Sequence, residues 1–413
     1  MTKAAPALDQ VRPTAVARQD DQRALKIDWS DGSQSRFAYA WLRDNAPEPH
    51  TFDFGKRNRA RLLLMNDFDP NVEPVETDIL DDGAIRIKWS TDSSSATYTS
   101  TWLRQRDLSD SALRESRLKS YHSWPVTTWD SQKVKDISQH PANWQKMITD
   151  DRYLRDQLVR FLSYGLLYVQ GVPQQENELA NLGNRMGYLL NSHYGKREDA
   201  TIFGVYAEPD PSNLMNTPRA LGLHTDFPQY QQCPEVQVLH VVRQAGEGGD
   251  SQFSDGFNVA EQLKVEQPDV YKTLTTYAVE FLDWGAEHYQ FQFAAKWRTI
   301  ETEIDGTLRG IYFNNQIRSW FYDAPVEEVP KIMHALKTFN DYCYQPRNLL
   351  AIKMNAGDMM WFANSRVLHG RSAFTPTPGS SRLLEGTYMN YDLILSKIRV
   401  VNEMYNETQH ASL

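Results

Sequence analysis

The sequence of 413 residues predicts a mainly β protein with helices, in which a small β-rich N-terminal domain precedes a larger double-stranded β-helix (jelly-roll) domain. Short alternating apolar and polar runs, bounded by turn residues, recur along the chain and are typical of short strands. Between those of the second half lie segments with helical spacing, such as residues 329–339, whose apolar stripe would cover a sheet. Many short strands with helices outside them are typical of a two-sheet jelly roll.

Changes in composition divide the chain into three parts. Residues 1–20 mix Pro, Ala, Gln and Asp without periodicity, which is typical of a mobile tail. Residues 24–45 and 84–103 each read as a pair of short strands, and the polar stretch 104–120 holds few large apolar residues. We therefore expect a tail over 1–20, a β-rich domain over 21–112 and the jelly roll over 113–413.

The second domain begins with a helix around 154–162, a strand at 165–173 and a helix around 179–186. Strand patterns then dominate, and helical patterns lie between them. The expected strands cover residues 235–242, 310–317, 349–354, 358–364 and 382–389.

Composition limits the kinds of partner. A net charge of -9 and a pI near 5.6 oppose broad affinity for nucleic acid or an anionic membrane. No apolar run approaches the roughly 20 residues of a membrane helix, and the first residues lack the apolar region of a signal peptide. The two cysteines, Cys233 and Cys343, suit a reducing compartment. We expect a cytoplasmic protein that acts on a small molecule.

The strongest chemical signal is a set of candidate metal ligands. The segment GLHTDFP places His224 and Asp226 two residues apart, and such residues share one face of a strand. His369 follows the predicted strand at 358–364, and Arg382 lies 13 residues beyond it. Two histidines and one carboxylate form the facial triad of non-heme Fe(II) oxygenases, which leaves three coordination positions open. Arg382 would pair with the distal carboxylate of 2-oxoglutarate through its guanidinium fork.

Other interpretations of the same residues exist. The three ligands could be unrelated core and surface residues. A zinc hydrolase could use the same three ligands, but no general base is evident and Arg382 would have no role. A small-molecule binding protein could keep the barrel without turnover, against which the intact triad and Arg382 argue. The Gly248-Gly249 pair reads as a turn because no phosphate-loop pattern follows it.

A series of motifs extends over nearly the whole chain. In order they are WLRDN at 41–45, LGNRMGYL, LGLHTDFP, GGDSQFSDGFN, YFNN, RVLHGRS and SRLLEGTYMNYD at 381–392. Their order and spacing resemble those of the γ-butyrobetaine and trimethyllysine hydroxylase family, within the taurine dioxygenase-like Fe(II)- and 2-oxoglutarate-dependent oxygenases. The resemblance implies iron ligands at His224, Asp226 and His369, and 2-oxoglutarate bound by Arg382 and Ser251. It also implies O2 as co-substrate, succinate and CO2 as co-products, and a homodimer.

The chain departs from the family where relatives hold a structural zinc. Ala46, Glu48 and Thr51 stand at the apparent cysteine positions, and Ser94 stands at the apparent histidine position. These side chains cannot form a tetrahedral site of soft ligands. His50 lies nearby, but a lone histidine in a polar loop is typical of a surface residue. We expect no structural zinc.

The resemblance also implies an aromatic cage for a trimethylammonium group, since aromatic ring faces attract a cation that cannot donate hydrogen bonds. The retained aromatic positions are Tyr194, Phe203, Phe227 and Tyr388. Asn216 replaces an aromatic residue, and residues 196–200 form an apparent insertion with two basic side chains.

The anionic end of the substrate needs hydrogen-bond donors. The candidates are Asn213, Asn314 and Asn315, with Arg318 as an alternative that could equally be a surface ion pair. The resulting hypothesis is hydroxylation of a small quaternary-ammonium zwitterion, with γ-butyrobetaine as the first candidate. A trimethylammonium phosphonate, trimethyllysine or another amino acid is the alternative substrate.

Overall fold

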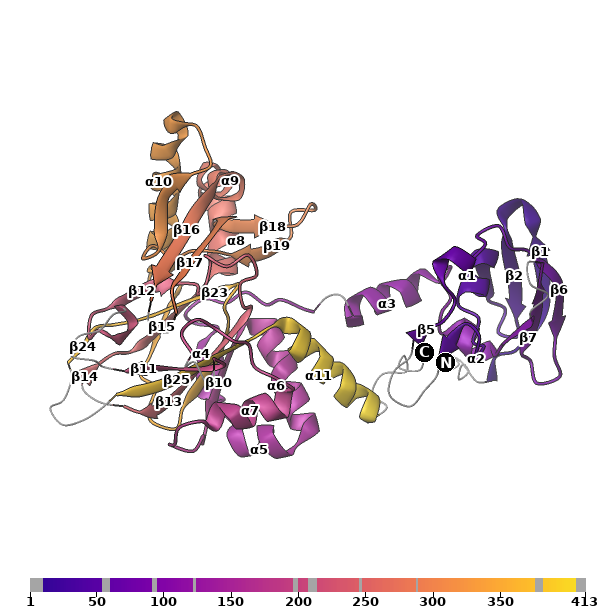
Figure 1. Cartoon of the computed structure of the whole chain (residues 1–413), viewed down its shortest axis with the longest axis horizontal. Helices are drawn as coiled ribbons and strands as arrows, with labels where there is room; N and C mark the ends of the chain where they lie inside the picture. The colour runs from indigo at the N-terminus through magenta and orange to yellow at the C-terminus, as the bar shows by residue number, and fades with distance from the viewer. Residues whose placement is uncertain are drawn as a thin grey trace. The chain divides into compact units, whose positions relative to one another are not determined.

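The computed structural model describes residues 10–53, 60–90, 95–121, 124–195, 200–206, 214–244, 247–286, 289–375 and 382–405. The chain mixes helices and strands and forms two compact units that divide between Trp124 and Pro125 (Figure 1). No helix among these residues has the length and apolar character that crossing a membrane requires.

The first unit contains two three-stranded antiparallel sheets. Their strands are β1 (Pro13–Gln19), β2 (Ala24–Trp29) and β3 (Gln34–Ala38) in one sheet, and β6 (Pro74–Ile79), β7 (Ile85–Trp89) and β8 (Ser95–Tyr98) in the other. One apolar core joins them, because Ile27 and Trp29 pack in the same cluster as Ile87 and Tyr98. The remaining elements are α1 (Tyr39–Asp44), β4 (Phe52–Asp53), β5 (Ala60–Arg61), α2 (Ser100–Arg104) and α3 (Ser111–Tyr121).

The expected mobile tail over residues 1–20 is wrong for its second half. Val11 is buried, and β1 pairs antiparallel with β2 from Pro13 to Gln19. Most side chains of β1 are nevertheless exposed or half-buried, since the strand lies at a sheet edge and backbone hydrogen bonds hold it. Such a strand needs no apolar alternation, which is why its sequence pattern is absent.

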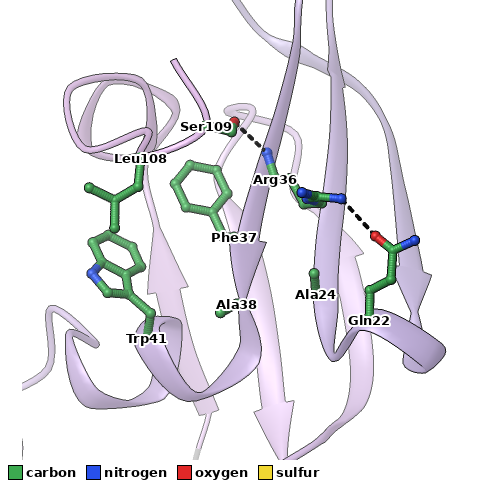
Figure 2. A pocket seen from close by; sticks show the side chains of 8 residues that line it. All are labelled: Gln22, Ala24, Arg36, Phe37, Ala38, Trp41, Leu108 and Ser109. Atoms are coloured by element: carbon green, nitrogen blue, oxygen red, sulfur yellow. Dashed lines mark hydrogen bonds between the residues drawn. The ribbon is translucent and has the colours of Figure 1, made fainter. Parts of the chain in front are cut away.

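This unit contains a groove of about 510 Å³. Figure 2 shows the side chains that line it. Arg36 donates two hydrogen bonds here: its backbone N–H donates to the Ser109 hydroxyl, and its guanidinium donates to the side-chain oxygen of Gln22. None of the predicted site residues is in its lining, which consists of Gln22, Ala24, Arg36, Phe37, Ala38, Trp41, Leu108 and Ser109.

The second unit contains a six-stranded sheet of order β11-β25-β13-β22-β10-β9 and a four-stranded sheet of order β12-β23-β15-β21. The first comprises β9 (Ala142–Asn143), β10 (Leu166–Gln170), β11 (Ile202–Tyr206), β13 (Val236–Arg243), β22 (Met359–Ala363) and β25 (Leu383–Met389). The second comprises β12 (Leu221–His224), β15 (Ser251–Asp255), β21 (Leu349–Ile352) and β23 (Val367–Arg371). Side chains of both sheets share one core, where the rings of Phe253 and Phe362 lie 5.5 Å apart.

Helices α5 (Trp144–Thr149), α6 (Asp151–Tyr164), α7 (Glu178–Met186) and α11 (Tyr391–Met404) lie together against the six-stranded sheet (Figure 1). Helix α6 begins where the Asp150 side chain accepts the Tyr153 N–H, and it ends at Gly165 with a φ of 67°. Its buried residues Leu154, Leu158 and Phe161 form the predicted apolar stripe. Short elements complete this part: α4 (Lys135–Gln139), β14 (Glu247–Gly248) and β24 (Phe374–Thr375).

A long segment between β15 and β21 has a core of its own. It contains α8 (Gly256–Glu266), α9 (Pro268–Thr276), β16 (Ala278–Gly285), β17 (Phe291–Arg298), β18 (Ile300–Thr302), β19 (Leu308–Ile311), β20 (Arg318–Tyr322) and α10 (Val329–Cys343). The expected strand over 310–317 is wrong, because β19 ends at Ile311 and β20 begins at Arg318. The backbone of Phe313 instead bonds Thr225: its carbonyl accepts the Thr225 N–H at 2.7 Å, and its N–H donates to the Thr225 hydroxyl at 3.1 Å.

A buried ion pair joins these elements and yields a stability prediction. Arg366 contacts Asp255 at 2.7 Å and also donates to the backbone carbonyls of Ser163 and Thr127. Replacing Asp255 with Ala leaves the guanidinium buried without its counter-charge, so we expect urea denaturation to show a loss of about 3–5 kcal/mol. The exposed pair of Lys337 and Asp341 is the control, and Asp341→Ala should cost less than about 1 kcal/mol. Equal losses in the two variants would contradict this account.

Candidate active site

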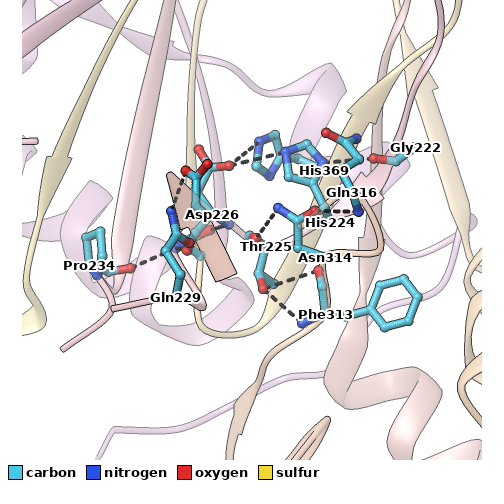
Figure 3. Close-up of polar contacts among 12 residues, drawn as sticks. Gly222, His224, Thr225, Asp226, Gln229, Pro234, Phe313, Asn314, Gln316 and His369 are labelled. Atoms are coloured by element: carbon cyan, nitrogen blue, oxygen red, sulfur yellow. Dashed lines mark hydrogen bonds and ion pairs between the residues drawn. The ribbon is translucent and has the colours of Figure 1, made fainter. Parts of the chain in front are cut away.

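Two histidines face each other across the β12–β23 strand pair. His224 is the direct partner of His369 in the antiparallel register, and their ring centroids lie 4.2 Å apart. The carboxylate of Asp226 lies 3.2 Å from Nε2 of His224 and 3.9 Å from Nε2 of His369 (Figure 3). One ligand atom from each residue lies within 4.8 Å of the other two, so the three side chains can reach one ion.

Neighbouring groups orient these side chains. Nδ1 of His224 lies 2.8 Å from the Gly222 carbonyl, and this contact orients the ring so that Nε2 is on the side of Asp226. The Asn364 amide accepts the Asp226 N–H at 2.7 Å and donates to the Asp226 carbonyl at 2.8 Å. The Tyr388 hydroxyl donates to Asp226 at 2.7 Å. Hydrogen bonds from surrounding residues therefore fix the orientation of His224 and Asp226, as is common for metal ligands.

The protonation states suit metal binding at neutral pH. Burial alone would raise the pKa of Asp226, but His369, His224 and the Tyr388 hydroxyl hold it well below its usual value. Burial and the neighbouring His224 lower the pKa of His369 to about 3, so its imidazole is neutral. Burial and the Asp226 charge raise the pKa of Tyr388, which keeps it a donor. A carboxylate and neutral imidazoles are the forms that ligate a divalent cation.

Phe227 directly follows the carboxylate and has a left-handed backbone with a φ of 60°. A non-glycine residue in this region stores roughly 1–2 kcal/mol of strain, which the surrounding contacts must hold. Here the Phe227 carbonyl accepts the Tyr230 N–H at 2.9 Å and the Cys233 thiol at 3.0 Å. Backbone strain of this kind is concentrated at functional sites.

The four aromatic residues of the predicted cage lie beside the triad, and each ring contacts two of the others. Tyr194 lies 6.1 Å from Phe203 and 5.2 Å from Phe227, and Tyr388 lies 5.3 Å from Phe203 and 4.7 Å from Phe227, between ring centroids. The Phe203 ring packs on Gly386, where a Cβ would lie 2.2 Å from the ring. The structure thus brings together all four aromatic residues, and Tyr388 joins them to Asp226.

A buried cationic region adjoins the triad. Arg382 is 4 % exposed, and its Nε and one terminal nitrogen have no hydrogen-bond partner among the described residues. Burial and the nearby Arg371 lower its pKa to about 10, which leaves it charged. Arg371 lies two residues beyond His369 on β23, and Ser251 is its direct partner on β15. An unpaired buried guanidinium fits the carboxylate of a bound co-substrate.

The predicted asparagines differ in their surroundings. Asn216 is buried and its side chain accepts the Tyr206 N–H at 3.2 Å. Asn314 is buried and its amide lies 3.4 Å from the Thr225 carbonyl (Figure 3). Asn315 is exposed and lines another cavity, of about 260 Å³, with Arg318 and residues of α10. Asn213 and residues 196–199, which include the two basic side chains of the apparent insertion, lie outside the described residues.

Buried polar side chains that the sequence analysis did not assign also reach this region. Gln237 is 2 % exposed and faces Tyr388 and Phe362 in the strand register, and its amide oxygen has no partner among the described residues. Its polar side chain inside the apolar strand EVQVLHVV was the available signal. His193 lies 4.2 Å from Tyr194 and 5.1 Å from Phe227 between ring centroids. Only its position next to Tyr194 in the sequence pointed to it.

The positions compared with a zinc site lie in the first unit. Ala46 and Thr51 are buried, and the Glu48 carboxylate accepts the Thr97 N–H at 2.9 Å. Ser94 lies outside the described residues. The absence of a structural zinc stays a prediction.

Comparisons with known proteins agree with this geometry, which is that of a non-heme metal oxygenase. Residues 130–388 match the family described as taurine catabolism dioxygenase TauD, TfdA family. Residues 16–104 match the family described as gamma-butyrobetaine hydroxylase-like, N-terminal. Gamma-butyrobetaine dioxygenase of Homo sapiens is 31% identical over 93% of this chain and 96% of its own length. The enzyme of the same name from Pseudomonas sp. (strain AK-1) is 29% identical over 91% of this chain and 93% of its own length.

Trimethyllysine dioxygenase of Meyerozyma guilliermondii is 24% identical over 92% of this chain and 94% of its own length. The chain belongs to the γ-butyrobetaine and trimethyllysine hydroxylase family, within the TauD, TfdA dioxygenases. The predicted family is thereby confirmed. The protein is an enzyme of the Fe(II)- and 2-oxoglutarate-dependent dioxygenase class.

The hydrogen bond from the Tyr388 hydroxyl to Asp226 can be tested by mutation. Replacing Tyr388 with Phe keeps the ring but removes the donor to Asp226, so we expect affinity for Fe(II) or Mn(II) to fall about tenfold in calorimetric titration. Tyr168→Phe is the matched control, because that buried hydroxyl donates to Asp358 instead. Unchanged metal affinity in Tyr388→Phe would show that the hydroxyl does not tune the site.

Proposed function

We propose that this protein hydroxylates a small quaternary-ammonium zwitterion such as γ-butyrobetaine, with 2-oxoglutarate and O2 consumed and succinate and CO2 released. In this proposal Fe(II) binds His224, Asp226 and His369, and the two sheets of the second unit form the double-stranded β-helix. The observation that carries the proposal is the convergence of the three ligand atoms within 4.8 Å beside a ring of aromatic side chains.

Fe(II) suits the donor set for chemical reasons. Two neutral imidazoles and one carboxylate on one face leave coordination positions for a chelating co-substrate and O2. When bound, the metal supplies the oxidising chemistry, and the chain's own groups supply orientation. Asn364 and Gly222 fix the ligands, and the Tyr388 hydroxyl holds one carboxylate oxygen.

Arg382 and Ser251 are proposed to bind 2-oxoglutarate. Arg382 is buried, charged and without a described carboxylate partner, and a bidentate pair with the distal carboxylate would neutralise it. Ser251 lies opposite Arg371 in the strand register, and its hydroxyl can donate a hydrogen bond to the same carboxylate. A zinc hydrolase would give this cationic region no role.

The aromatic residues Tyr194, Phe203, Phe227 and Tyr388 are proposed to surround the quaternary nitrogen. Their ring faces attract a cation, and a trimethylammonium group needs no hydrogen bond. Asn213, Asn314 and Asn315 stay the candidates for the anionic end, and Asn216 stands where relatives have another aromatic residue of the cage. The named gamma-butyrobetaine and trimethyllysine dioxygenases among the relatives support a substrate of this class.

The protein's part in the reaction is to hold one C–H bond close to the metal and to exclude water. The two sheets contribute the rings of Phe253 and Phe362 to this region, and the loop after β12 contributes that of Phe227; all three are buried. A dry site of fixed geometry strengthens the charge interactions inside it and lowers the entropic barrier. A homodimer and a cytoplasmic location remain expectations from the sequence.

The test is succinate formation with a panel of betaines, trimethyllysine, trimethylammonium phosphonates and free amino acids. For γ-butyrobetaine the matched comparison is 5,5-dimethylhexanoate, in which carbon replaces the quaternary nitrogen. A desolvated cation–π contact is worth about 2 kcal/mol, so we expect 5,5-dimethylhexanoate, which keeps the carboxylate but lacks the cation, to need about 30-fold higher concentration for half-maximal turnover.

Equal stimulation by γ-butyrobetaine and by 5,5-dimethylhexanoate would contradict the aromatic cage. Stimulation by another compound class alone would overturn the substrate while leaving the iron site intact. Failure of every compound, with 2-oxoglutarate and Fe(II) bound, would favour a non-catalytic ligand-binding relative.

A further inference from the structure

Two buried guanidinium groups lie near the same aromatic ring, next to the candidate iron site. Arg371 and Arg382 are 6 % and 4 % exposed, and both lie over the ring of Phe374, at 5.1 and 5.2 Å from its centroid. Neither forms an ion pair with a carboxylate of the described part of the chain. Two like charges in a buried environment repel each other unless an anion lies near them.

Arg371 differs from Arg382 in what it holds. It donates to the backbone carbonyls of Met215, at 2.8 Å, and of Thr217, and it lies 3.5 Å from that of Arg219. These carbonyls belong to one short segment, residues 214–219, and no side chain of that segment is needed for the contact. The guanidinium fork therefore fixes the path of this backbone between β11 and β12.

The segment 214–219 also forms part of the proposed substrate site. It carries Asn216, whose side chain accepts the Tyr206 N–H of β11 and is buried. Its last residues lead into β12, which ends at the metal ligand His224. Arg371 thus bonds the backbone of segment 214–219, which belongs to the proposed substrate site. Its charge also acts on Arg382, the proposed anchor of 2-oxoglutarate.

We propose that Arg371 is a positioning residue that couples 2-oxoglutarate binding at Arg382 to the order of segment 214–219. The co-substrate's distal carboxylate offsets the repulsion between the two guanidinium groups, so Arg371 keeps its hydrogen bonds to the segment more of the time. Ordered carbonyls hold Asn216 in place for the substrate. Binding of 2-oxoglutarate then raises affinity for the substrate, and the reverse holds by linkage. This inference rests on the proposed role of Arg382.

Hydrogen exchange of the segment tests the coupling directly. The full chain is loaded with Mn(II), with and without 2-oxoglutarate, and exchange is measured by mass spectrometry on peptides that cover 214–219. We expect 2-oxoglutarate to slow exchange about tenfold in the unmodified protein, within the usual range of coupling between sites. In Arg371→Met exchange should be fast in both states, because the hydrogen bonds are gone.

Two further variants separate charge from geometry. Arg371→Lys keeps the charge without the fork that reaches several carbonyls, so it should also lose the tenfold effect. If thermal melting shows that Arg371→Met does not fold, the exchange measurement on Arg371→Lys replaces it as the test. Arg309→Met, on an exposed side chain of β19, is the control and should behave like the unmodified protein.

Each result has a distinct meaning. Binding of 2-oxoglutarate to the unmodified protein without slower exchange at 214–219 would overturn the coupling alone. Retention of the effect in Arg371→Lys would overturn the role of the fork. Failure of the unmodified protein to bind 2-oxoglutarate in calorimetry would instead overturn the proposed function of Arg382.

Discussion

The site depends on the register of one antiparallel strand pair. Because His224 is the direct partner of His369, their side chains share a face and start close together. A slip by one residue would turn one imidazole to the opposite face and remove a ligand. Gly370 permits the close approach, since a Cβ there would lie 2.6 Å from the Leu221 carbonyl. The glycine of the HGR motif is therefore explained by backbone packing between the two histidine strands.

Strands β23 and β25 carry or adjoin most of the remaining residues of the candidate site. On β23, Arg371 lies two residues after His369, so the proposed metal ligand and the cationic region face the same way. Arg382 directly precedes β25, and Tyr388 lies near the end of that strand, where it contacts Asp226. Rigid strands fix the spacing between the metal, the proposed co-substrate anchor and the aromatic rings. Function of this kind needs rigid elements because small displacements cost rate.

Much of this could be predicted from the sequence, and the limits have physical causes. The triad was visible from the residue types and their order, although His224 and Asp226 do not share a strand, because β12 ends at His224 and Asp226 lies in the loop after it. Strands β13, β22 and β25 were visible from apolar runs. Strand β1 was missed because an edge strand is held by backbone hydrogen bonds. Residues 312–317 were misassigned because their backbone bonds residues far away in sequence: Phe313 bonds Thr225, and the Ile317 carbonyl accepts the Leu282 N–H. The position of Arg371 beside both Arg382 and segment 214–219 is a tertiary property that no local pattern encodes.

The central claim is that one Fe(II) ion binds at the triad and accepts 2-oxoglutarate as a chelating ligand. Anaerobic titration with Fe(II) and 2-oxoglutarate, followed by visible absorption, tests it most directly. The account predicts a weak charge-transfer band that saturates at about one equivalent of iron per chain and is absent in His369→Ala, with the fold retained by circular dichroism. A band of the same strength in His369→Ala, or iron binding without any band in the unmodified protein, would contradict it.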